Sequence, residues 1–440
     1  MKLKTIYICK SCFHESGKWL GQCPSCNAWN SFEEDVVSTQ NRSPISGTVK
    51  KISASEPRNL FSIKTESKRL ITNIKEFDRV LGGGIVPGSL LLLSGEPGIG
   101  KSTLTLQIAS NLANEHKVLI VSGEESIEQI SDRARRLKSN QNNLSAVNEY
   151  NLETILETIK SEHPSFVIID SIQVISSMDL PSQAGSITQV RYCTEQIMEL
   201  AKTKNISIML IGHVTKDGNL AGPRVLEHLV DAVLQLEGDR FQQFRILRAV
   251  KNRFGSASEV GIFDMQENGL IEVENPSKQL LEGRKENAIG SAITVAIEGT
   301  RPFLVEVQAL VSTSSFGYPK RTANGFDLNR LQILIAVLEK YAKLNLQNQD
   351  VFVNIVGGIK LNEPAADLAV LMAIASSLLK KPINPNAVIF GEVGLSGELR
   401  KVNHSDKRLK ESTKLGFTQI ISSDQFKEIS QVLQTLKQNQ

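Results

Sequence analysis

Short apolar runs and amphipathic helical patterns alternate along the chain between residues 90 and 213. The apolar runs have the length of buried strands, and the segments between them place apolar residues at the spacing of one helix face. Such alternation predicts a parallel sheet that is covered by helices on both faces. The predicted strands lie at 90–93, 117–125, 165–170 and 206–218, the last with a polar exit, and the predicted helices at 101–114, 126–138, 152–162 and 186–205.

The pattern changes after a polar break at residues 274–291. The predicted elements are two strands within 291–312, a helix at 327–344, a strand at 350–358, a small-residue helix at 363–379, a hairpin at 387–402 and a closing helix at 406–417. Because strands and helices no longer alternate regularly, this part predicts an α+β domain.

A chain of 440 residues is too long for one hydrophobic core, so we expect several domains. We place a cysteine-rich module at 1–34, a linker at 35–66, the α/β domain at 67–275 and the α+β domain at 276–440. The linker is rich in Ser, Thr, Asn and Lys. Its scattered cations indicate either contact with an acidic polymer or a solvated tether.

Composition adds few constraints on function. The apolar fraction of 40% is ordinary, and the formal net charge of +3 is too small to argue for or against a nucleic-acid partner. No segment has the roughly 18 apolar residues of a membrane span, and the N-terminus lacks the apolar stretch of a secretory signal. We therefore expect a cytoplasmic protein with no membrane partner, whose cysteines are reduced or metal-bound.

Four of the five cysteines form two C-x2-C pairs near the N-terminus. Each pair places two thiolates on one tight turn, and two such turns complete the tetrahedral sulfur shell that suits Zn²⁺. A pair of disulfides or a redox dithiol is the alternative. Trp19 and Trp29 are expected to pack beside the metal, and the separate Cys193 is expected to be a buried apolar residue. The zinc ligands would be Cys9, Cys12, Cys23 and Cys26.

The segment 95–102 matches the P-loop pattern G-x4-G-K-[ST] and lies between a predicted strand and a predicted helix, as its mechanism requires. Its glycines let backbone N–H groups surround phosphates at the start of a helix. In this pattern Lys101 reaches the β- and γ-phosphates, Ser102 binds Mg²⁺ and Thr103 contacts the α-phosphate. The sequence thus predicts an Mg-ATP site formed by Gly95, Glu96, Pro97, Gly98, Ile99, Gly100, Lys101, Ser102 and Thr103.

Acidic residues end two of the predicted strands. Asp170 fits the second carboxylate of a P-loop enzyme, which holds Mg²⁺ through water. Glu124 is placed to polarise the attacking water, with Glu125 as the alternative. His213 is either a γ-phosphate contact or a hydrogen-bonded loop residue. A strand-end turn aspartate and a solvated glutamate pair are the alternatives without a catalytic role.

A glutamate base in this position is similar to the arrangement of RecA-like motors, which form rings with each nucleotide at a subunit boundary. Lys251 and Arg253 lie two positions apart at the end of a late apolar run, so in a strand both leave from the same side. The similarity implies that they reach the γ-phosphate of the neighbouring subunit and stabilise transition-state charge. Direct contact with DNA phosphate or a solvated strand end are the alternatives.

The cysteine pairs, the P-loop and the segments S-G-E-E-S, I-I-D-S-I-Q and V-K-N-R-F-G together resemble the bacterial RadA (Sms) family of DNA repair proteins, from residue 7 to about residue 430. The resemblance implies a RecA-like, DNA-dependent ATPase that extends heteroduplex at branched recombination intermediates, as a hexameric ring on single-stranded DNA. It also implies a RecA-type recombinase as partner and a place at the nucleoid. Its K-N-R-F-G motif, which couples nucleotide to DNA, maps onto Lys251, Asn252, Arg253, Phe254 and Gly255.

Two loops would face the central channel of such a ring. One is polar and Gly-rich and contains Lys216 and Arg224, and the other spans 176–186. A basic channel binds single strands with little base readout, so these cations are candidate DNA contacts. Ordinary surface loops are the alternative.

The last third resembles the proteolytic domain of Lon in the phrases E-P-A-A-D-L-A-V and G-E-V-G-L-S-G-E-L-R. That family has a nucleophilic serine where this chain has Ala365, and without an oxygen nucleophile acyl transfer cannot start. Ser376 and Ser377 lie about three helical turns away. We therefore expect a non-proteolytic scaffold for ring assembly and DNA contact. A basic cluster on it comprises Lys401, Lys407, Arg408 and Lys410, with solvated side chains as the alternative.

The leading hypothesis is an ATP-driven DNA motor. The first rival is a nucleotide-gated scaffold in which ATP only sets the oligomeric state, and the second is an ATP-dependent protease.

Overall fold

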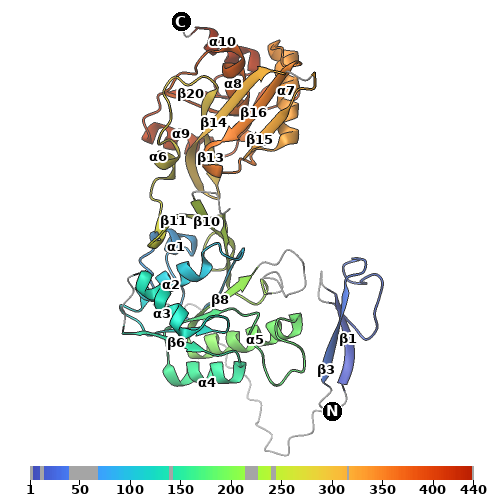
Figure 1. The fold of residues 1–440 in the computed structure, drawn as a ribbon, viewed down its shortest axis with the longest axis vertical. Helices are drawn as coiled ribbons and strands as arrows, with labels where there is room; N and C mark the ends of the chain where they lie inside the picture. Colours follow the sequence, from blue (N-terminus) through green and yellow to red (C-terminus); the bar gives the residue numbers. More distant parts are fainter. Residues whose placement is uncertain are drawn as a thin grey trace, which may run out of the picture. The chain divides into compact units, whose positions relative to one another are not determined.

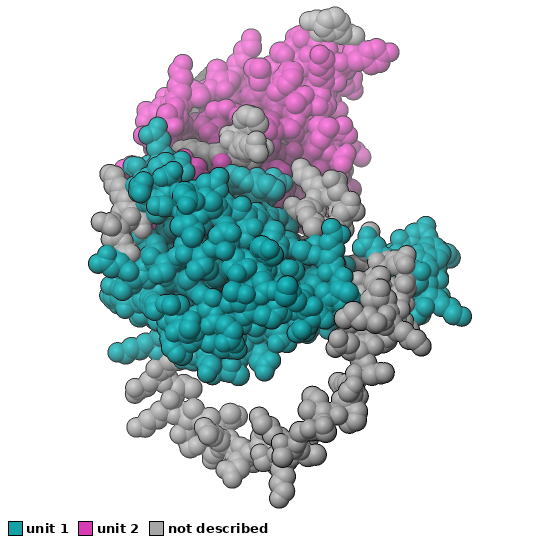
Figure 2. All heavy atoms as spheres, turned by 60° about the horizontal axis from the view of Figure 1, so that its bottom comes forward, with its two compact units in different colours: residues 1–237, 247–257, 266–270 teal, residues 238–246, 258–265, 271–440 magenta. Residues whose placement is uncertain are grey.

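The computed structural model describes residues 3–9, 14–38, 68–137, 142–213, 226–238, 244–314 and 317–438. These residues form two compact units, which Figure 2 colours separately. Unit 1 comprises residues 1–237, 247–257 and 266–270, and unit 2 comprises 238–246, 258–265 and 271–440. The chain therefore passes repeatedly between the units before residue 271, whereas the sequence pattern predicted one boundary after residue 275.

A small antiparallel sheet with the strand order β2-β1-β3 forms the N-terminal part of the chain (Figure 1). Its strands are β1 (Leu3–Cys9), β2 (Glu15–Ser16) and β3 (Phe32–Ser38). Because β3 pairs with β1 as far as Ser38, the ribbon continues past the boundary predicted at residue 34. The rest of the predicted linker lies outside the described residues.

A nine-stranded sheet contains the predicted α/β core, with the strand order β12-β11-β10-β9-β4-β8-β7-β5-β6. The strands from β4 to β9 belong to unit 1, and residues of β10, β11 and β12 are divided between the units. The pairs that join β9, β4, β8, β7, β5 and β6 are all parallel. The bounds are β4 (Leu90–Gly95), β5 (Val118–Ser122), β6 (Leu144–Asn148), β7 (Phe166–Asp170), β8 (Ser207–His213), β9 (Ala232–Glu237), β10 (Phe244–Asn252), β11 (Val260–Gln266) and β12 (Gly269–Glu272).

Helices cover both faces of this parallel sheet, as the alternating pattern predicted. Leu90 and Leu92 of β4 belong to a buried cluster with residues of α4 and α5. Leu91 and Leu93 therefore face the other side, where α2 contacts β4, β5 and β7. The helices are α1 (Lys75–Val80), α2 (Lys101–Leu112), α3 (Ile127–Arg136), α4 (Leu152–Glu162) and α5 (Ile187–Lys204).

Three of these helices begin where a side-chain oxygen accepts a hydrogen bond from an otherwise free backbone N–H. Ser126 caps α3, Asn151 caps α4 and Ser186 caps α5. The caps fix where each helix leaves the carboxyl edge of the sheet, and the predicted residues Lys101, Glu124 and Asp170 lie at that edge.

Unit 2 is an α+β domain built on a four-stranded sheet with the order β13-β14-β16-β15. The helices α7 and α8 pack against one another and join its buried core. The bounds are α6 (Pro276–Leu280), β13 (Ser291–Glu298), β14 (Arg301–Thr313), β15 (Arg321–Asn324), α7 (Leu328–Ala342), β16 (Gln349–Ile355), α8 (Asp367–Leu379), β17 (Ala387–Phe390), β18 (Glu392–Val393), β19 (Leu399–Arg400), α9 (Ser405–Lys414), β20 (Gln419–Ser422) and α10 (Ile429–Gln438).

Two predictions for the end of unit 2 were wrong. The segment 387–402 is not one hairpin, because β17 is fully buried and pairs in parallel with β20. Only the short strands β18 and β19 form an antiparallel pair there. The predicted closing helix is α9, but β20 and α10 follow it.

In the part of the chain that the structure describes, no helix has both the length and the apolar character that a bilayer crossing needs.

Candidate functional site

Four strands of unit 1 end side by side and bring the predicted nucleotide residues together. In the order β4-β8-β7-β5, these strands end at Gly95, His213, Asp170 and Ser122. Gly95 lies opposite His213 in the register, and Asp170 lies opposite Ser122. Glu124 follows two residues after β5. Parallel pairing thus converts four separate segments into one site at the carboxyl edge of the sheet.

The P-loop joins β4 to α2 in the geometry that its motif predicted. Gly98 and Gly100 adopt positive φ angles of 77° and 115°, which a side chain at either position would disfavour. The ammonium of Lys101 donates to the carbonyl oxygens of Gly95 and Glu96, at 3.0 Å each. Burial lowers the pKa of Lys101, while the nearby carboxylates of Asp170 and Glu124 oppose this change. Within the described chain its charge is thus held by the loop's own carbonyls and two carboxylates, which suits an incoming phosphate.

Ser102 and Asp170 form the second part of the site. The Ser102 hydroxyl donates to Asp170 Oδ2 at 2.9 Å. Burial raises the pKa of Asp170, and the hydrogen bond from Ser102 opposes that change. One hydroxyl and one carboxylate at this spacing are the oxygen ligands that a P-loop supplies to Mg²⁺, so the residues present fit that ion.

Glu124 lies beside Asp170 and His213 in the predicted nucleotide site. Its carboxylate accepts a hydrogen bond from Ser171, and atoms of Glu124, Asp170 and His213 lie within 4.8 Å of one another. The neighbouring imidazole of His213 holds the pKa of Glu124 below its ordinary value. Glu125 instead forms an ion pair with Arg133 on α3. Glu125 and Arg133 also line a small pocket with Ser102 and Asp170, so the choice of Glu124 as the base stays a prediction.

His213 lies between the P-loop strand and the strand of Asp170. Its Nε2 is 3.5 Å from Glu124 Oε1, which is longer than a good hydrogen bond. Both ring nitrogens are buried without another hydrogen-bond partner among the described residues. These nitrogens could therefore bind a polar ligand, and the γ-phosphate role of His213 stays a prediction.

Lys251 and Arg253 lie at the opposite end of β4 from the P-loop. Lys251 donates to the carbonyl oxygens of Glu227 and Val230, at 2.6 and 2.9 Å. The Arg253 guanidinium lies 3.3 Å from the carboxylate of Asp231, whose other oxygen accepts from the backbone N–H of Leu90. Lys251 near the end of β10 and Arg253 just after it thus both contact the segment 227–231.

The distance between the two ends excludes one role for these cations. Leu90 begins β4 and Gly95 ends it, so about 16 Å of strand separates Asp231 from the start of the P-loop. Arg253 therefore cannot contact the nucleotide of its own P-loop.

The other predicted DNA contacts of this motif make contacts within the chain. Asn252 donates to the carbonyl of Val80 at 3.2 Å and accepts from the N–H of Phe254 at 2.9 Å. A Cβ at Gly255 would come within 3.3 Å of the Cα of Gly82. The segment 251–255 is thus a tightly packed turn, in which glycine is needed at residue 255 for close approach.

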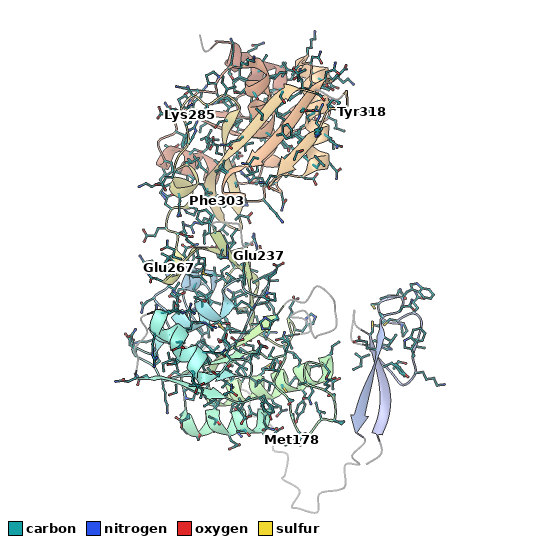
Figure 3. All side chains as sticks on the ribbon, viewed as in Figure 1. Met178, Glu237, Glu267, Lys285, Phe303 and Tyr318 are labelled. Carbon is teal, nitrogen blue, oxygen red and sulfur yellow. The ribbon has the colours of Figure 1, made fainter. Side chains whose placement is uncertain are left out.

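Of the predicted DNA-loop residues, Lys216 and Arg224 lie outside the described residues. The loop 176–186 is described, and the side chain of Gln189 holds it from inside by donating to the carbonyls of Ser177, Leu180 and Ser182. Met178, labelled in Figure 3, is strongly exposed on it. The loop contains no Lys or Arg, so it offers no side-chain cation to a phosphate.

Three of the predicted zinc ligands are described and meet at one point. The sulfur atoms of Cys9, Cys23 and Cys26 all lie within 4.8 Å of one another, and those of Cys9 and Cys26 are 3.6 Å apart. Four sulfurs at the usual Zn–S distance of about 2.3 Å would be about 3.8 Å apart, so the described sulfurs fit a tetrahedral zinc site. Cys12 lies outside the described residues.

The structure also describes the two tryptophans and the remaining cysteine, Cys193. Trp19 and Trp29 remain 52% and 71% exposed and flank Gly21, whereas Phe32 and Tyr7 pack with Cys9 and Cys23. Cys193 is fully buried as predicted, and burial raises the pKa of its thiol to about 12.

In unit 2 the position at which the Lon-like pattern would have a nucleophilic serine is not accessible. Ala365 is buried, and its carbonyl accepts from the N–H of Gly391. Ser376 and Ser377 accept hydrogen bonds from the backbone N–H groups of Gly290 and Val311. These serines therefore bind the backbone of neighbouring segments rather than replace the nucleophile.

The predicted basic cluster of unit 2 loses one member. Arg408 is only 1% exposed and forms an ion pair with Glu363, so it is not a surface cation. Lys401, Lys407 and Lys410 stay exposed. Charge periodicity along a helix does not reveal that one cation has an ion-pair partner 45 residues earlier.

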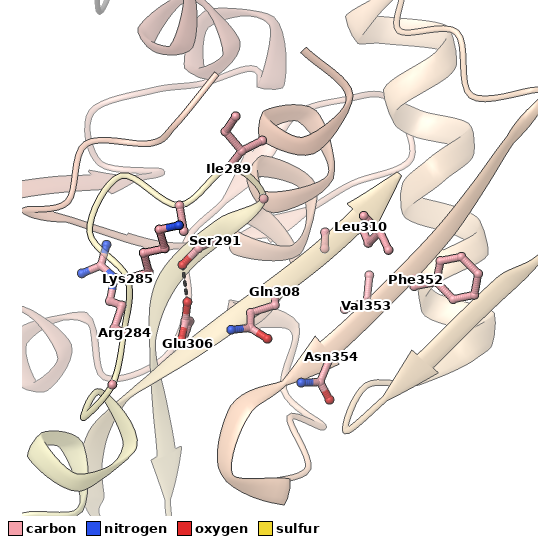
Figure 4. A pocket seen from close by; sticks show the side chains of 14 residues that line it. Arg284, Lys285, Ile289, Ser291, Glu306, Gln308, Leu310, Phe352, Val353 and Asn354 are labelled. Carbon is pink, nitrogen blue, oxygen red and sulfur yellow. Dashed lines mark hydrogen bonds between the residues drawn. The ribbon is translucent and has the colours of Figure 1, made fainter. Parts of the chain in front are cut away.

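Unit 2 also contains a cavity of about 410 Å³, shown in Figure 4. Ser291 and Glu306 form a hydrogen bond in its wall, beside the side chains of Gln308, Leu310 and Asn354. None of the predicted nucleotide or DNA residues is among the residues that line it.

Sequence reasoning missed three residues that contact the predicted ones. Ser171 follows Asp170 directly, so its position at a strand end was a usable signal. Asp231 precedes the apolar strand β9, which was itself not predicted. Arg69 donates to the carbonyl of Phe254, and no local pattern around residue 69 indicates that contact.

Comparison with known proteins gives two family matches. Residues 55–219 match an AAA domain, and residues 7–34 match a rubredoxin metal binding domain. A solved structure of a KaiC-like protein from Pyrococcus horikoshii OT3 is 20% identical, with a TM-score of 0.40 and coverage of 47% of this chain and 99% of that chain. The two family matches confirm the predicted P-loop α/β domain and the N-terminal cysteine ribbon.

Curated relatives extend the similarity to nearly the whole chain. The DNA repair protein RadA of Bacillus subtilis is 51% identical over 425 residues, which are 96% of this chain and 92% of the relative. The protein of the same name from Halalkalibacterium halodurans is 48% identical, with coverage of 96% and 93%. That from Listeria monocytogenes is 51% identical, with coverage of 95% and 92%. This chain therefore belongs to the RadA family of DNA repair proteins.

Proposed function

We propose that the chain is a DNA-dependent ATPase of recombination and repair that drives branch migration and heteroduplex extension. The observation that carries the proposal is the position of two chemical groups at opposite ends of β4. The predicted phosphate, magnesium and base residues meet at Gly95, and two cations that cannot reach that site lie beside Leu90. Each subunit would therefore supply nucleotide-binding residues from one end of β4 and cations from the other. A complete hydrolysis site would then form between two subunits that assemble head to tail.

At the carboxyl edge, each residue has a separate task. Lys101 would exchange its loop carbonyls for the β- and γ-phosphates, and the loop N–H groups would bind the phosphate oxygens. Ser102 and Asp170 would hold Mg²⁺, which neutralises charge on the phosphates. Glu124 would orient and deprotonate the attacking water, because hydrogen bonds keep its carboxyl ionised. His213 would donate to the γ-phosphate through its unpartnered nitrogens.

At the opposite end, Lys251 and Arg253 would serve the neighbouring subunit. A guanidinium supplied from another subunit stabilises the charge that develops in phosphoryl transfer. We propose a hexameric ring on single-stranded and branched DNA, with the scaffold of unit 2 assisting assembly, and a RecA-type recombinase as partner. In this proposal the protein acts at the nucleoid in the cytoplasm.

The decisive experiment is a branch-migration assay on a synthetic three-strand intermediate, with ATP, without ATP and with a non-hydrolysable analogue. Movement of the branch with ATP alone supports the motor. Stimulation of hydrolysis by single-stranded DNA supports it independently. Nucleotide-dependent assembly without either effect would favour a nucleotide-gated scaffold.

Replacing Glu124 with glutamine is expected to lower ATP turnover about 100-fold while nucleotide affinity changes little, because the variant removes the base and keeps its shape. Steady-state hydrolysis and binding of a fluorescent ATP analogue measure the two effects. Glu125→Gln is the matched comparison, because Glu125 is the alternative base and its carboxylate is paired with Arg133. A larger loss in Glu125→Gln would assign the base to Glu125.

We also propose that the ribbon holds one Zn²⁺ on its four cysteines. Replacing Cys23 with serine is expected to remove that zinc and release the ribbon's fold, since so small a module depends on its metal. Both tryptophans of the chain lie in the ribbon, so the anisotropy of tryptophan fluorescence reports on it selectively and should fall. Cys193→Ser should retain zinc. Full zinc content in Cys23→Ser would refute the assignment.

A further inference from the structure

Each residue of the turn 251–255 is fixed by a neighbour within unit 1. Lys251 is bound by two carbonyls of the segment before β9, and Asn252 by the end of α1. Arg253 is bound by Asp231, the carbonyl of Phe254 by Arg69, and Gly255 packs against Gly82. The turn is therefore built in one conformation before any neighbouring subunit arrives.

Asp231 is the most buried polar group in this arrangement. It is 4% exposed, and its carboxylate accepts from the backbone N–H of Leu90 at 3.0 Å and from Lys202. Burial by itself would raise the pKa of Asp231, but the hydrogen bonds from Lys202 and Leu90 and the charge of Arg253 hold it below its ordinary value. A buried, ionised carboxylate of this kind is a fixed point for the cation beside it.

Arg253 itself is more loosely held. Its side chain is 57% exposed, and among the described residues Asp231 is the ion-pair partner of its guanidinium. A guanidinium has five N–H donors in a planar fork, so the contact with Asp231 leaves most of them available for a phosphate. The Asp231 carboxylate thus orients the Arg253 guanidinium without using all of its N–H donors.

Arg69 fixes the same turn from the other side. Its guanidinium donates to the carbonyl of Phe254 at 3.0 Å and to those of Leu81 and Gly84 at 3.0 and 3.3 Å. One side chain thus ties the turn to the end of α1 by three hydrogen bonds. Its partners are carbonyls, so shape as well as charge matters for this contact.

We propose that Asp231 and Arg69 are positioning residues, which hold Arg253 in the orientation that reaches the triphosphate of a neighbouring subunit. The inference rests on the proposed function, because it assumes that Arg253 acts on a nucleotide bound next door. It assigns a role to two residues that lie outside both the P-loop and the K-N-R-F-G motif.

The main test is a double-mutant cycle with Asp231→Asn and Arg253→Ala. Asparagine keeps an acceptor for the N–H of Leu90 and removes the charge that orients Arg253. Asp231→Asn is expected to lower turnover at saturating ATP about tenfold with KM for ATP within about twofold of wild type. The double variant should be no slower than Arg253→Ala, because Asp231 acts through Arg253.

The second test uses Arg69. Arg69→Ala is expected to lower turnover about fivefold, and Arg69→Lys should behave like it, because an ammonium cannot match three carbonyls as a planar fork does. Arg135→Ala, which removes an exposed guanidinium paired with Asp132 on α3, is the control and should stay within about twofold. Rescue by lysine would reduce Arg69 to a charge effect and overturn its positioning role.

The outcomes separate this inference from the proposal on which it rests. Unchanged turnover in Arg253→Ala overturns the trans-acting role itself. A slow Arg253→Ala with normal Asp231→Asn and Arg69→Ala overturns only the positioning role. Additive losses in the double variant also overturn it, since Asp231 would then act independently. Thermal unfolding of each variant is followed by circular dichroism, and an unfolded Asp231→Asn leaves the Arg69 series to decide.

Discussion

Replacing Lys101 with alanine is expected to lower ATP turnover on the order of 10³-fold, or below detection. The ammonium is buried in the P-loop and is held there by the carbonyls of Gly95 and Glu96, so no other cation of the described P-loop replaces it at the β- and γ-phosphates. The measurement is steady-state phosphate release at saturating ATP, with and without single-stranded DNA.

Lys160→Ala provides the control for this prediction. Lys160 lies on α4 and forms an exposed pair with Glu157, so its removal should leave turnover within about twofold. Substantial hydrolysis by the Lys101→Ala protein would show that the phosphate site lies elsewhere and would remove the basis of the proposed function.

Replacing Arg253 with alanine is expected to lower turnover of the assembled protein about 10³-fold, the lower end of the range for a cation supplied from a neighbouring subunit. Nucleotide affinity of the isolated subunit should not change, because about 16 Å of strand separates this arginine from its own P-loop. Single-turnover kinetics and equilibrium binding measure the two quantities.

A mixing experiment makes the prediction sharper. Lys101→Ala subunits keep their cations, and Arg253→Ala subunits keep their P-loops, so mixed assemblies contain some complete sites. Mixing two nearly inactive proteins should therefore restore measurable hydrolysis. If Arg253→Ala instead changes only DNA affinity and the salt dependence of binding, the arginine contacts DNA phosphate. Failure of the mixture to recover, in assemblies that demonstrably exchange subunits, would also count against the shared site.

The nucleotide site was predictable because its chemistry is encoded in short segments. The P-loop is contiguous, and Asp170 and His213 each end an apolar run. In a parallel sheet all such ends share one edge, so their proximity followed without knowing the strand order. The order itself, with β8 and β7 between β4 and β5, was not contained in any local pattern.

The surroundings of Arg253 could not be predicted for the opposite reason. The contact between Arg69 and Phe254 joins residues 185 positions apart, and the apolar pattern constrains neither of them. Arg408 illustrates the same limit in unit 2, because its burial depends on Glu363 in another element. Polar contacts over long sequence distances depend on tertiary packing rather than on periodicity or composition.

The strand β4 has a consequence for how a closed assembly would operate. Its first residue is hydrogen-bonded to the carboxylate that also binds Arg253, and its last residue belongs to the loop that surrounds the phosphates. In the proposed ring, each β4 strand would rigidly connect two successive nucleotide-binding sites. A small displacement at one nucleotide-binding site would then be transmitted through the backbone of β4 to the next site. This connection would favour sequential rather than random ATP hydrolysis around the ring.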